Sequence, residues 1–232
     1  MTLSLIKNMR SLKAAAYLFD LNGTIIDDMA YHHKAWFHIL NDELGASLSW
    51  EEVKQEMYGK NQELLIRVFG NERFSAQEMQ EISIQKEIRY QKEFLPELKL
   101  LPGLTTFLQQ SAAAGIKMAI GSAAIPFNID FVLDNLNIRN YFPVIISAED
   151  VRHSKPDPET FTMAAQKLNV NPEDCIVFED APKGVEAAER AGMQAVVLTT
   201  THQENEFAQY KNILCFCTGY DGLKAELMPS NG

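Results

Sequence analysis

Short apolar runs recur along this chain, and each stops at a polar residue. The first run, Ala14 to Phe19, ends at Asp20 and is followed by a turn that contains Gly23. A run that is apolar at every position is typical of a strand buried on both faces of a parallel sheet. We expect further strands at residues 116–120, 144–146, 175–178, 195–198 and, where two cysteines alternate with larger residues, 213–217.

Amphipathic stretches separate the apolar runs and predict helices. In the second half of the chain these stretches lie between the strands, at residues 104–114, 127–136, 158–168 and 183–191. Strands and helices that alternate in this way favour an α/β fold with a doubly wound, Rossmann-like parallel sheet.

The alternation is interrupted between residues 28 and 98, where every pattern is helical. Helices are expected there at residues 31–44, 51–58, 62–69 and 75–94. We therefore predict an α/β core of residues 1–27 and 99–232 and an inserted all-helical cap domain of residues 28–98. Hinges are expected near Asp27 and Asp28 and between Pro96 and Gly103, because turn-forming residues gather at the second of these places.

Composition narrows the class of protein. The 232 residues carry a net charge of −10, and no apolar stretch reaches the ~20 residues of a membrane helix. The first twelve residues lack a long apolar segment, so we expect a frayed terminus and not a signal peptide. Three cysteines without a framework spacing favour a reducing, cytoplasmic location. The chain has no basic run, so we expect no nucleic-acid partner, and we also expect a monomer without membrane association.

Residues suited to phosphate or metal chemistry follow the expected strands. They are Asp20, Ser122, the loop residue Lys155, and the pair Glu179 and Asp180. The carboxyl ends of parallel strands meet at one edge of a sheet, so we expect these side chains to lie together. Each has a structural explanation as well: Ser122 and Asp180 could cap helices, and Lys155 could be a solvated loop charge. None of these structural explanations accounts for the whole set at strand ends, whereas the set suits phosphoryl-transfer chemistry.

The same segments resemble the four motifs of the haloacid dehalogenase-like superfamily, within its β-phosphoglucomutase-like group. The motifs appear in order as Asp20-Leu21-Asn22-Gly23-Thr24, Gly121-Ser122, Ser154-Lys155-Pro156-Asp157-Pro158, and Glu179-Asp180 followed by Gly184 and Ala191-Gly192-Met193. The segment from Tyr31 to Trp36 is similar to the start of the cap domain in that group. The likeness extends over nearly the whole chain.

The resemblance implies a role for each motif residue. Asp20 would attack phosphorus and become a transient aspartyl-phosphate. Mg²⁺ would be held by Asp20, the backbone carbonyl of Asn22, and Asp180, with Glu179 bound directly or through water.

The remaining motif residues would bind the phosphate. The Ser122 hydroxyl and the backbone N–H of Ala123 would bind its oxygens, and Lys155 would neutralise charge on both Asp20 and the phosphate.

Position 22 departs from the family pattern. Phosphoryl-transferring members have an Asp there, which protonates the leaving oxygen and then activates water, whereas this chain has Asn22. An amide cannot shuttle a proton, and general acid–base help is worth ~10²–10⁴ in rate. We therefore expect slow turnover of ordinary phosphate esters. Either an Asp was deliberately changed to Asn, or the natural protein differs here from its relatives.

Three features of the cap bear on the substrate. In the mutases of this group an Arg of the cap binds the distal phosphate of the substrate. This chain has Gln62 at that place, and Lys60 could substitute for the Arg. His32 matches a mutase histidine at the junction of core and cap, where it could be a packing residue or a catalytic orienter. Lys86 and Arg89 are expected on the solvated face of the long charged helix.

Together these observations predict a Mg²⁺-dependent phosphohydrolase of a small phosphorylated metabolite, similar to a sugar phosphate, that is slowed by Asn22. The alternatives are a β-phosphoglucomutase that acts on a hexose phosphate and a catalytically silent sensor that binds Mg²⁺ and a phosphate ligand.

Overall fold

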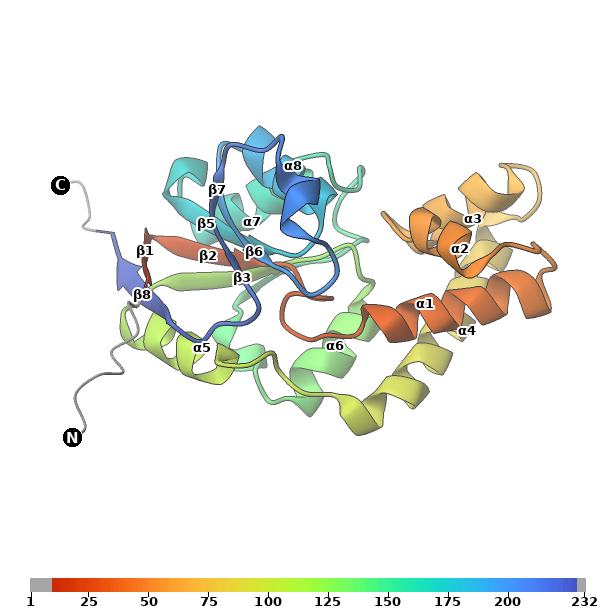
Figure 1. Cartoon of the computed structure of the whole chain (residues 1–232), viewed down its shortest axis with the longest axis horizontal. Helices are drawn as coiled ribbons and strands as arrows, with labels where there is room; N and C mark the ends of the chain where they lie inside the picture. The colour runs from red at the N-terminus through yellow and green to blue at the C-terminus, as the bar shows by residue number, and fades with distance from the viewer. Residues whose placement is uncertain (1–9, 229–232) are drawn as a thin grey trace.

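The computed structural model describes residues 10–228 and has a six-stranded parallel sheet at its centre (Figure 1). Across the sheet the strands are β4 (Val144–Ile146), β3 (Lys117–Gly121), β2 (Ala16–Phe19), β5 (Cys175–Glu179), β6 (Gln194–Leu198) and β7 (Ile213–Cys217). Phe19 at the end of β2 pairs with Ile120 on one side and Phe178 on the other. The next residues of the three central strands therefore leave the sheet at one level.

Helices cover both faces of this sheet, as the strand–helix alternation predicts. They are α5 (Leu104–Ala113), α6 (Pro126–Asn135), α7 (Glu159–Leu168) and α8 (Pro182–Arg190). Tyr17 and Phe19 of β2 point toward α5 and α6, whereas Ala16 and Leu18 point toward α7 and α8. The first face is rich in aromatic rings, and the rings of Phe19 and Phe178 stack with centroids 4.6 Å apart. The doubly wound α/β fold is confirmed.

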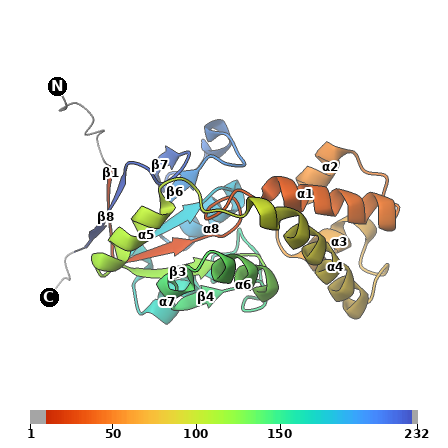
Figure 2. The same cartoon turned by 90° about the horizontal axis from the view of Figure 1, so that it is seen from below.

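A helical insert lies between β2 and α5, beyond the edge of the sheet at which β2 ends (Figures 1 and 2). It consists of α1 (Met29–His38) with a π-helical extension (Ile39–Glu43), α2 (Trp50–Glu56), α3 (Asn61–Phe69) and α4 (Ala76–Phe94). It has an apolar cluster of its own, which includes Trp36, Leu40 and Leu65. The inserted helical cap is confirmed, and its limits at residues 28 and 98 stay a prediction.

Short 3-10 turns complete the described chain, at Leu95–Glu97, Arg139–Tyr141, Pro172–Asp174 and Glu204–Phe207. None of the helices within residues 10–228 is both long and apolar enough to cross a membrane.

The two ends of the described chain form a second, two-stranded parallel sheet. In it β1 (Arg10–Ala14) pairs with β8 (Leu223–Leu227), and the Tyr17 hydroxyl donates to the carbonyl of Leu12 at 2.5 Å. The prediction of a frayed terminus is therefore wrong for residues 10–12, and residues 1–9 lie outside the described residues. The predicted strand at 14–19 is also divided at Ala15, because Ala14 belongs to β1. A local pattern predicts neither the ordered residues 10–12 nor the break at Ala15, because β1 forms only by pairing with β8 at the other end of the chain.

Gly103 fixes the path by which the chain returns from the insert to the core. Its φ of +78° lies in the left-handed region, and a Cβ there would lie 2.5 Å from the backbone nitrogen of Asp221. The preceding residue, Pro102, accepts a hydrogen bond from the backbone N–H of Tyr220 at 2.7 Å. The exit from the insert is thus tied to the loop before β8.

Replacing Gly103 by Ala is expected to lower the free energy of unfolding by about 3 kcal/mol, since backbone strain and a clash with Asp221 add together. Gly115 is a matched control, because its φ is +76° but a Cβ there would meet nothing within 4 Å. Gly115→Ala should cost only the strain, about 1–2 kcal/mol. Urea denaturation measures both, and equal losses in the two variants would contradict the proposed clash.

Candidate active site

Three carboxylates meet where the central strands end. Asp20 directly follows β2, Glu179 is the last residue of β5, and Asp180 follows it. The backbone N–H of Asp20 donates to the carbonyl of Phe178 at 2.9 Å, which ties the two strand ends together. All three side chains are buried. The structure therefore brings these residues together at the sheet edge where the sequence places them.

Lys155 supplies the positive charge among them. Its Nζ donates to Asp20 Oδ1 at 2.6 Å and to Glu179 Oε1 at 2.7 Å. Burial lowers the pKa of Lys155, but the two adjacent carboxylates outweigh it and hold this pKa above its usual range. One ammonium beside three carboxylates leaves the site with negative charge to neutralise.

That excess charge is visible in the pKa of the acidic groups. Burial raises the pKa of Asp20 to about 7, where Lys155 opposes the rise and Glu179 adds to it. Burial also raises the pKa of Asp180 well above its usual value, and repulsion from Glu179 and Asp20 adds to the effect. A cation bound between Asp20 and Asp180 would keep both carboxylates ionised near neutral pH.

The backbone packs against two of the carboxylates at positions where only glycine fits. A Cβ on Gly23 would lie 2.2 Å from Asp180 Oδ2, and one on Gly184 would lie 1.7 Å from Glu179 Oε1. Glu179 Oε2 accepts from the backbone N–H groups of Asp180 and Ala181, at 2.9 and 2.8 Å. Glu179 thus has both oxygens engaged, whereas Lys155 contacts Asp20 through Oδ1.

These residues fit a hard divalent cation. Within residues 10–228 no three His, Cys, Asp or Glu side chains already converge on one point as a preformed metal centre. Mg²⁺ does not need such a cluster, because it is usually held by one or two carboxylates together with water and substrate oxygens. Asp20 and Asp180, with a nearby backbone carbonyl, form a donor set of that kind.

Ser122 stands on the other side of Asp20, immediately after β3. It is buried, and its backbone N–H donates to the carbonyl of Ile146 at 2.9 Å. Its Oγ accepts from the N–H of Ala124 at 3.1 Å, so the hydroxyl hydrogen can be donated to a ligand. The arrangement is suited to an oxyanion at the end of β3.

A cavity of about 190 Å³ lies between the sheet edge and the helical insert. All the residues singled out from the sequence as site residues line it: Asp20, Asn22, His32, Lys60, Ser122, Ala123, Lys155, Glu179 and Asp180.

The loop between α2 and α3 and the first turn of α3 contact the core beside this cavity. Lys60 Nζ donates to the carbonyl of Val151 at 2.6 Å, and the Ser154 hydroxyl donates to Glu63 at 3.0 Å. Both core residues lie close to Lys155 in the chain. A substrate contact by Lys60 stays a prediction, since its ammonium binds a core carbonyl here.

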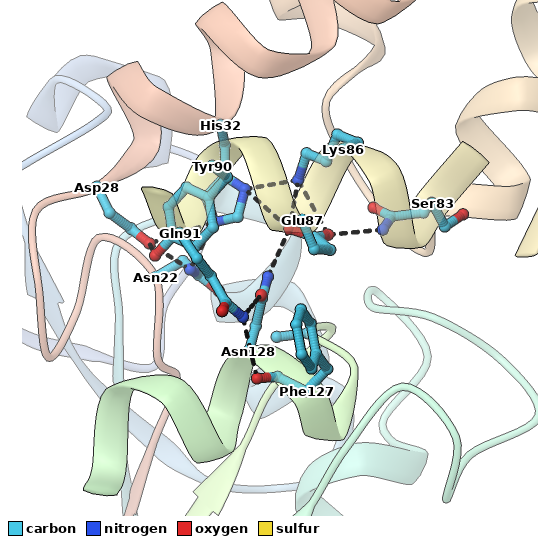
Figure 3. Close-up of polar contacts among 12 residues, drawn as sticks. Asn22, Asp28, His32, Ser83, Lys86, Glu87, Tyr90, Gln91, Phe127 and Asn128 are labelled. Carbon is cyan, nitrogen blue, oxygen red and sulfur yellow. Dashed lines mark hydrogen bonds and ion pairs between the residues drawn. The ribbon is translucent and has the colours of Figure 1, made fainter. Parts of the chain in front are cut away.

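A buried polar network extends from Asn22 into the insert (Figure 3). Asn22 Nδ2 lies 2.5 Å from Asp28 Oδ2 and 2.9 Å from His32 Nε2. His32 Nδ1 lies 2.6 Å from Lys86 Nζ, which also donates to Glu87 at 3.0 Å. His32 is therefore part of a network that reaches residue 22, and it also stacks on a ring of α4.

This network corrects the expectation for Lys86. The residue is only 2% exposed, so its predicted position on a solvated face is wrong. The face of α4 that includes Lys86, Glu87 and Tyr90 is buried in the structure despite its charge. Arg89 lies on the exposed side of α4, 3.4 Å from Glu43, as expected.

Two residues of the loop after β6 belong to the site although they were not predicted from the sequence. The Thr201 hydroxyl donates to the carboxylate of Asp180, and His202 Nδ1 lies 3.1 Å from the carbonyl of Asp180. Both residues line the cavity. The strand-end rule that identified Asp20 and Glu179 points to this loop too, because it follows the apolar run at 195–198.

Comparison with known proteins agrees with this geometry. A family model of haloacid dehalogenase-like hydrolases matches residues 14–192. The chain is 31% identical to the fructose-1-phosphate phosphatase YqaB of Escherichia coli K12, over 78% of this chain and 95% of that one. It is 34% identical to the β-phosphoglucomutase of Bacillus subtilis, over 78% of this chain and 81% of the relative.

A solved structure gives the same result. The β-phosphoglucomutase of Clostridium difficile superposes with a TM-score of 0.75 at 30% identity, covering 87% of this chain and 90% of that one. The chain belongs to the haloacid dehalogenase-like hydrolases, among the relatives of β-phosphoglucomutase, and is a phosphatase or phosphotransferase of that family.

Proposed function

We propose that this protein hydrolyses the phosphate ester of a small phosphorylated sugar through an aspartyl-phosphate on Asp20. The observation that carries the proposal is the contact of Lys155 with Asp20 and Glu179, in a cavity that Ser122 and residues of the insert also line. Relatives support the substrate class. One acts on fructose 1-phosphate, and another, from Thermotoga maritima, is a phosphatase of phosphorylated carbohydrates and is 28% identical.

Asp20 is the nucleophile in this mechanism. A carboxylate oxygen of Asp20, which Lys155 contacts at Oδ1, forms the bond to phosphorus while the bond from phosphorus to the ester oxygen breaks. The leaving oxygen takes its proton from solvent, because Asn22 cannot supply one. Water then attacks the same phosphorus and loses a proton to solvent, while the bond from phosphorus to the Asp20 oxygen breaks, so that phosphate is released and the Asp20 carboxylate is restored. Ser122 and the N–H of Ala123 donate to the phosphate oxygens, and Lys155 neutralises charge as it develops.

Mg²⁺ is the cation we assign to the carboxylates. Asp20, Asp180 and the backbone carbonyl of Asn22 would hold it, and Glu179 would act through water because both of its oxygens are engaged. The bound ion supplies neutralisation of phosphate charge in a site that is itself negative.

Asn22 sets the rate of both chemical steps. Its amide cannot donate a proton to the leaving oxygen or remove one from water, so each step loses the ~10²–10⁴ that general acid–base catalysis supplies. Esters with weakly basic leaving groups depend less on the first proton. With those substrates we expect the aspartyl-phosphate to accumulate, visible as a burst of leaving group before slow turnover.

Transfer to a sugar hydroxyl, as in a mutase, is the second candidate, and the 34% identity to a β-phosphoglucomutase favours it. Gln62 stands where that group has an Arg, and Lys60 is engaged by Val151. Hydrolysis is therefore preferred. A silent sensor would bind Mg²⁺ and phosphate without forming a phosphoenzyme.

The nucleophile is tested by Asp20→Asn. This variant should fold normally but lose all labelling by a radiolabelled acyl phosphate, because the amide is not a nucleophile toward phosphorus. Asp27→Asn, at an exposed carboxylate close in sequence, is the control and should be labelled like the wild type. Labelling that survives in Asp20→Asn would refute the assignment. The product formed from a sugar phosphate separates the two activities, because hydrolysis releases inorganic phosphate whereas a mutase makes an isomeric sugar phosphate.

The metal is tested by titration calorimetry. Asp180→Ala should bind Mg²⁺ at least tenfold more weakly, since it leaves Asp20 as the remaining carboxylate ligand. In the wild type the affinity should fall about tenfold from pH 8 to pH 6, because the pKa of Asp20 near 7 makes the cation compete with a proton. Equal affinity in Asp180→Ala, or no dependence on pH, would contradict the proposed site.

The role of the insert is tested by Lys60→Ala. Without its bond to Val151 the insert should close less often, and kcat/KM on the best sugar phosphate should fall about tenfold. The exposed Lys54 provides the control, since Lys54→Ala removes the same charge from the neighbouring helix. Unchanged kcat and KM in Lys60→Ala would show that Lys60 neither closes the insert nor contacts the substrate.

A further inference from the structure

Asp28 is a carboxylate fully shielded from solvent, at the point where the chain enters the insert. Its Oδ2 accepts a hydrogen bond from the Tyr90 hydroxyl at 2.6 Å and from Asn22 Nδ2 at 2.5 Å. Its Oδ1 is buried and has no hydrogen-bond partner among the described residues. Burial of a carboxylate with one oxygen unsatisfied is costly, so its presence beside the site requires an explanation.

The imidazole of His32 lies beside the same oxygen. The ammonium of Lys86 can only donate hydrogen bonds. Its Nζ lies 2.6 Å from His32 Nδ1, so Nδ1 is the acceptor of this bond. The ring hydrogen is then on Nε2, which lies 3.2 Å from Asp28 Oδ2 and 2.9 Å from Asn22 Nδ2. Since Nδ2 is itself a donor, Oδ2 is the acceptor within reach of both nitrogens. Asp28 Oδ2 thus accepts from an amide and a hydroxyl, and an imidazole nitrogen lies 3.2 Å from it (Figure 3).

This arrangement depends on the amide at position 22. Asn22 directs Nδ2 toward Asp28, so the carbonyl oxygen of the same planar group points away from Asp28. With a carboxylate at position 22, one of its oxygens would replace Nδ2 at 2.5 Å from Asp28 Oδ2, and two carboxylate oxygens would then face each other. The hydrogen bonds of the Lys86 ammonium go to His32 and Glu87.

We propose that Asn22 and Asp28 are a matched pair, in which Asp28 is a positioning residue that makes an amide the side chain required at position 22. Asn22 is then a native feature of this site and not an accidental loss of the family's acid. The amide has no proton to transfer to the reacting groups, which restricts fast turnover to phosphate esters whose leaving oxygen departs without receiving one. This last consequence rests on the proposed function, whereas the pairing does not.

A set of substitutions separates the pair from its neighbours. The variants are Asn22→Asp, Asp28→Asn and their combination, with Asn22→Asp/Asp27→Asn as the matched control because Asp27 is exposed and adjacent. Asn22→Asp alone should lower the melting temperature by about 5–10 °C, as expected when a buried charge loses its partner. Asp28→Asn should restore the loss in the combined variant, and Asp27→Asn should not.

Turnover gives a second readout, one that a purely structural contact would not move. On an alkyl phosphate, Asn22→Asp/Asp28→Asn should exceed Asp28→Asn by about 10²–10⁴ in kcat, and Asn22→Asp alone should gain less. On an aryl phosphate the gain in the burst phase should be smaller, because that leaving group needs no proton.

The melting temperatures decide the pairing even if no variant releases phosphate, a result that would overturn only the proposed function. The pairing is overturned if Asn22→Asp melts with the wild type, or if Asp27→Asn restores stability as well as Asp28→Asn does. If Asn22→Asp cannot be obtained folded, recovery of folded protein with Asp28→Asn, and not with Asp27→Asn, supports it. Recovery with both or with neither overturns it.

Discussion

Burial of three carboxylates beside one ammonium is the constraint on which the rest of the site depends. The parallel register of the central strands brings Asp20 and Glu179 to one level, and Lys155 contacts both. The site still carries excess negative charge, in a chain whose net charge is −10. A phosphate dianion would be repelled by such a site, so substrate binding requires both a cation and donors such as Ser122. Electrostatics thus links the metal to the substrate.

The helical insert contributes to the same balance from the opposite side. Its polar network connects Asn22 through His32 and Lys86 to Glu87, and Asn128 of the core donates to Glu87 at 2.6 Å. The environment of position 22 is therefore set by α4, a helix far away in sequence. Any movement of the insert would change the groups around the residue that meets the leaving oxygen.

The sequence predicts the strand ends and their chemistry well, because a short apolar run determines a buried strand and the parallel order determines which ends meet. It does not predict the pairing of β1 with β8. In that pairing Arg10 lies opposite Leu223, which is about 210 positions away in the sequence. Lys86 and Asp28 were also not foreseen as buried, since charged residues are seldom buried unless tertiary partners satisfy them. Their partners come from separate elements, and no local spacing reveals them.

The central claim is that Asp20 itself forms the bond to phosphorus. Reduction with borohydride during turnover of a phosphate ester converts an aspartyl-phosphate to homoserine, which peptide mapping by mass spectrometry locates. We expect homoserine at position 20, dependent on substrate and absent without Mg²⁺. Release of phosphate with an unmodified Asp20 under the same conditions would contradict the account.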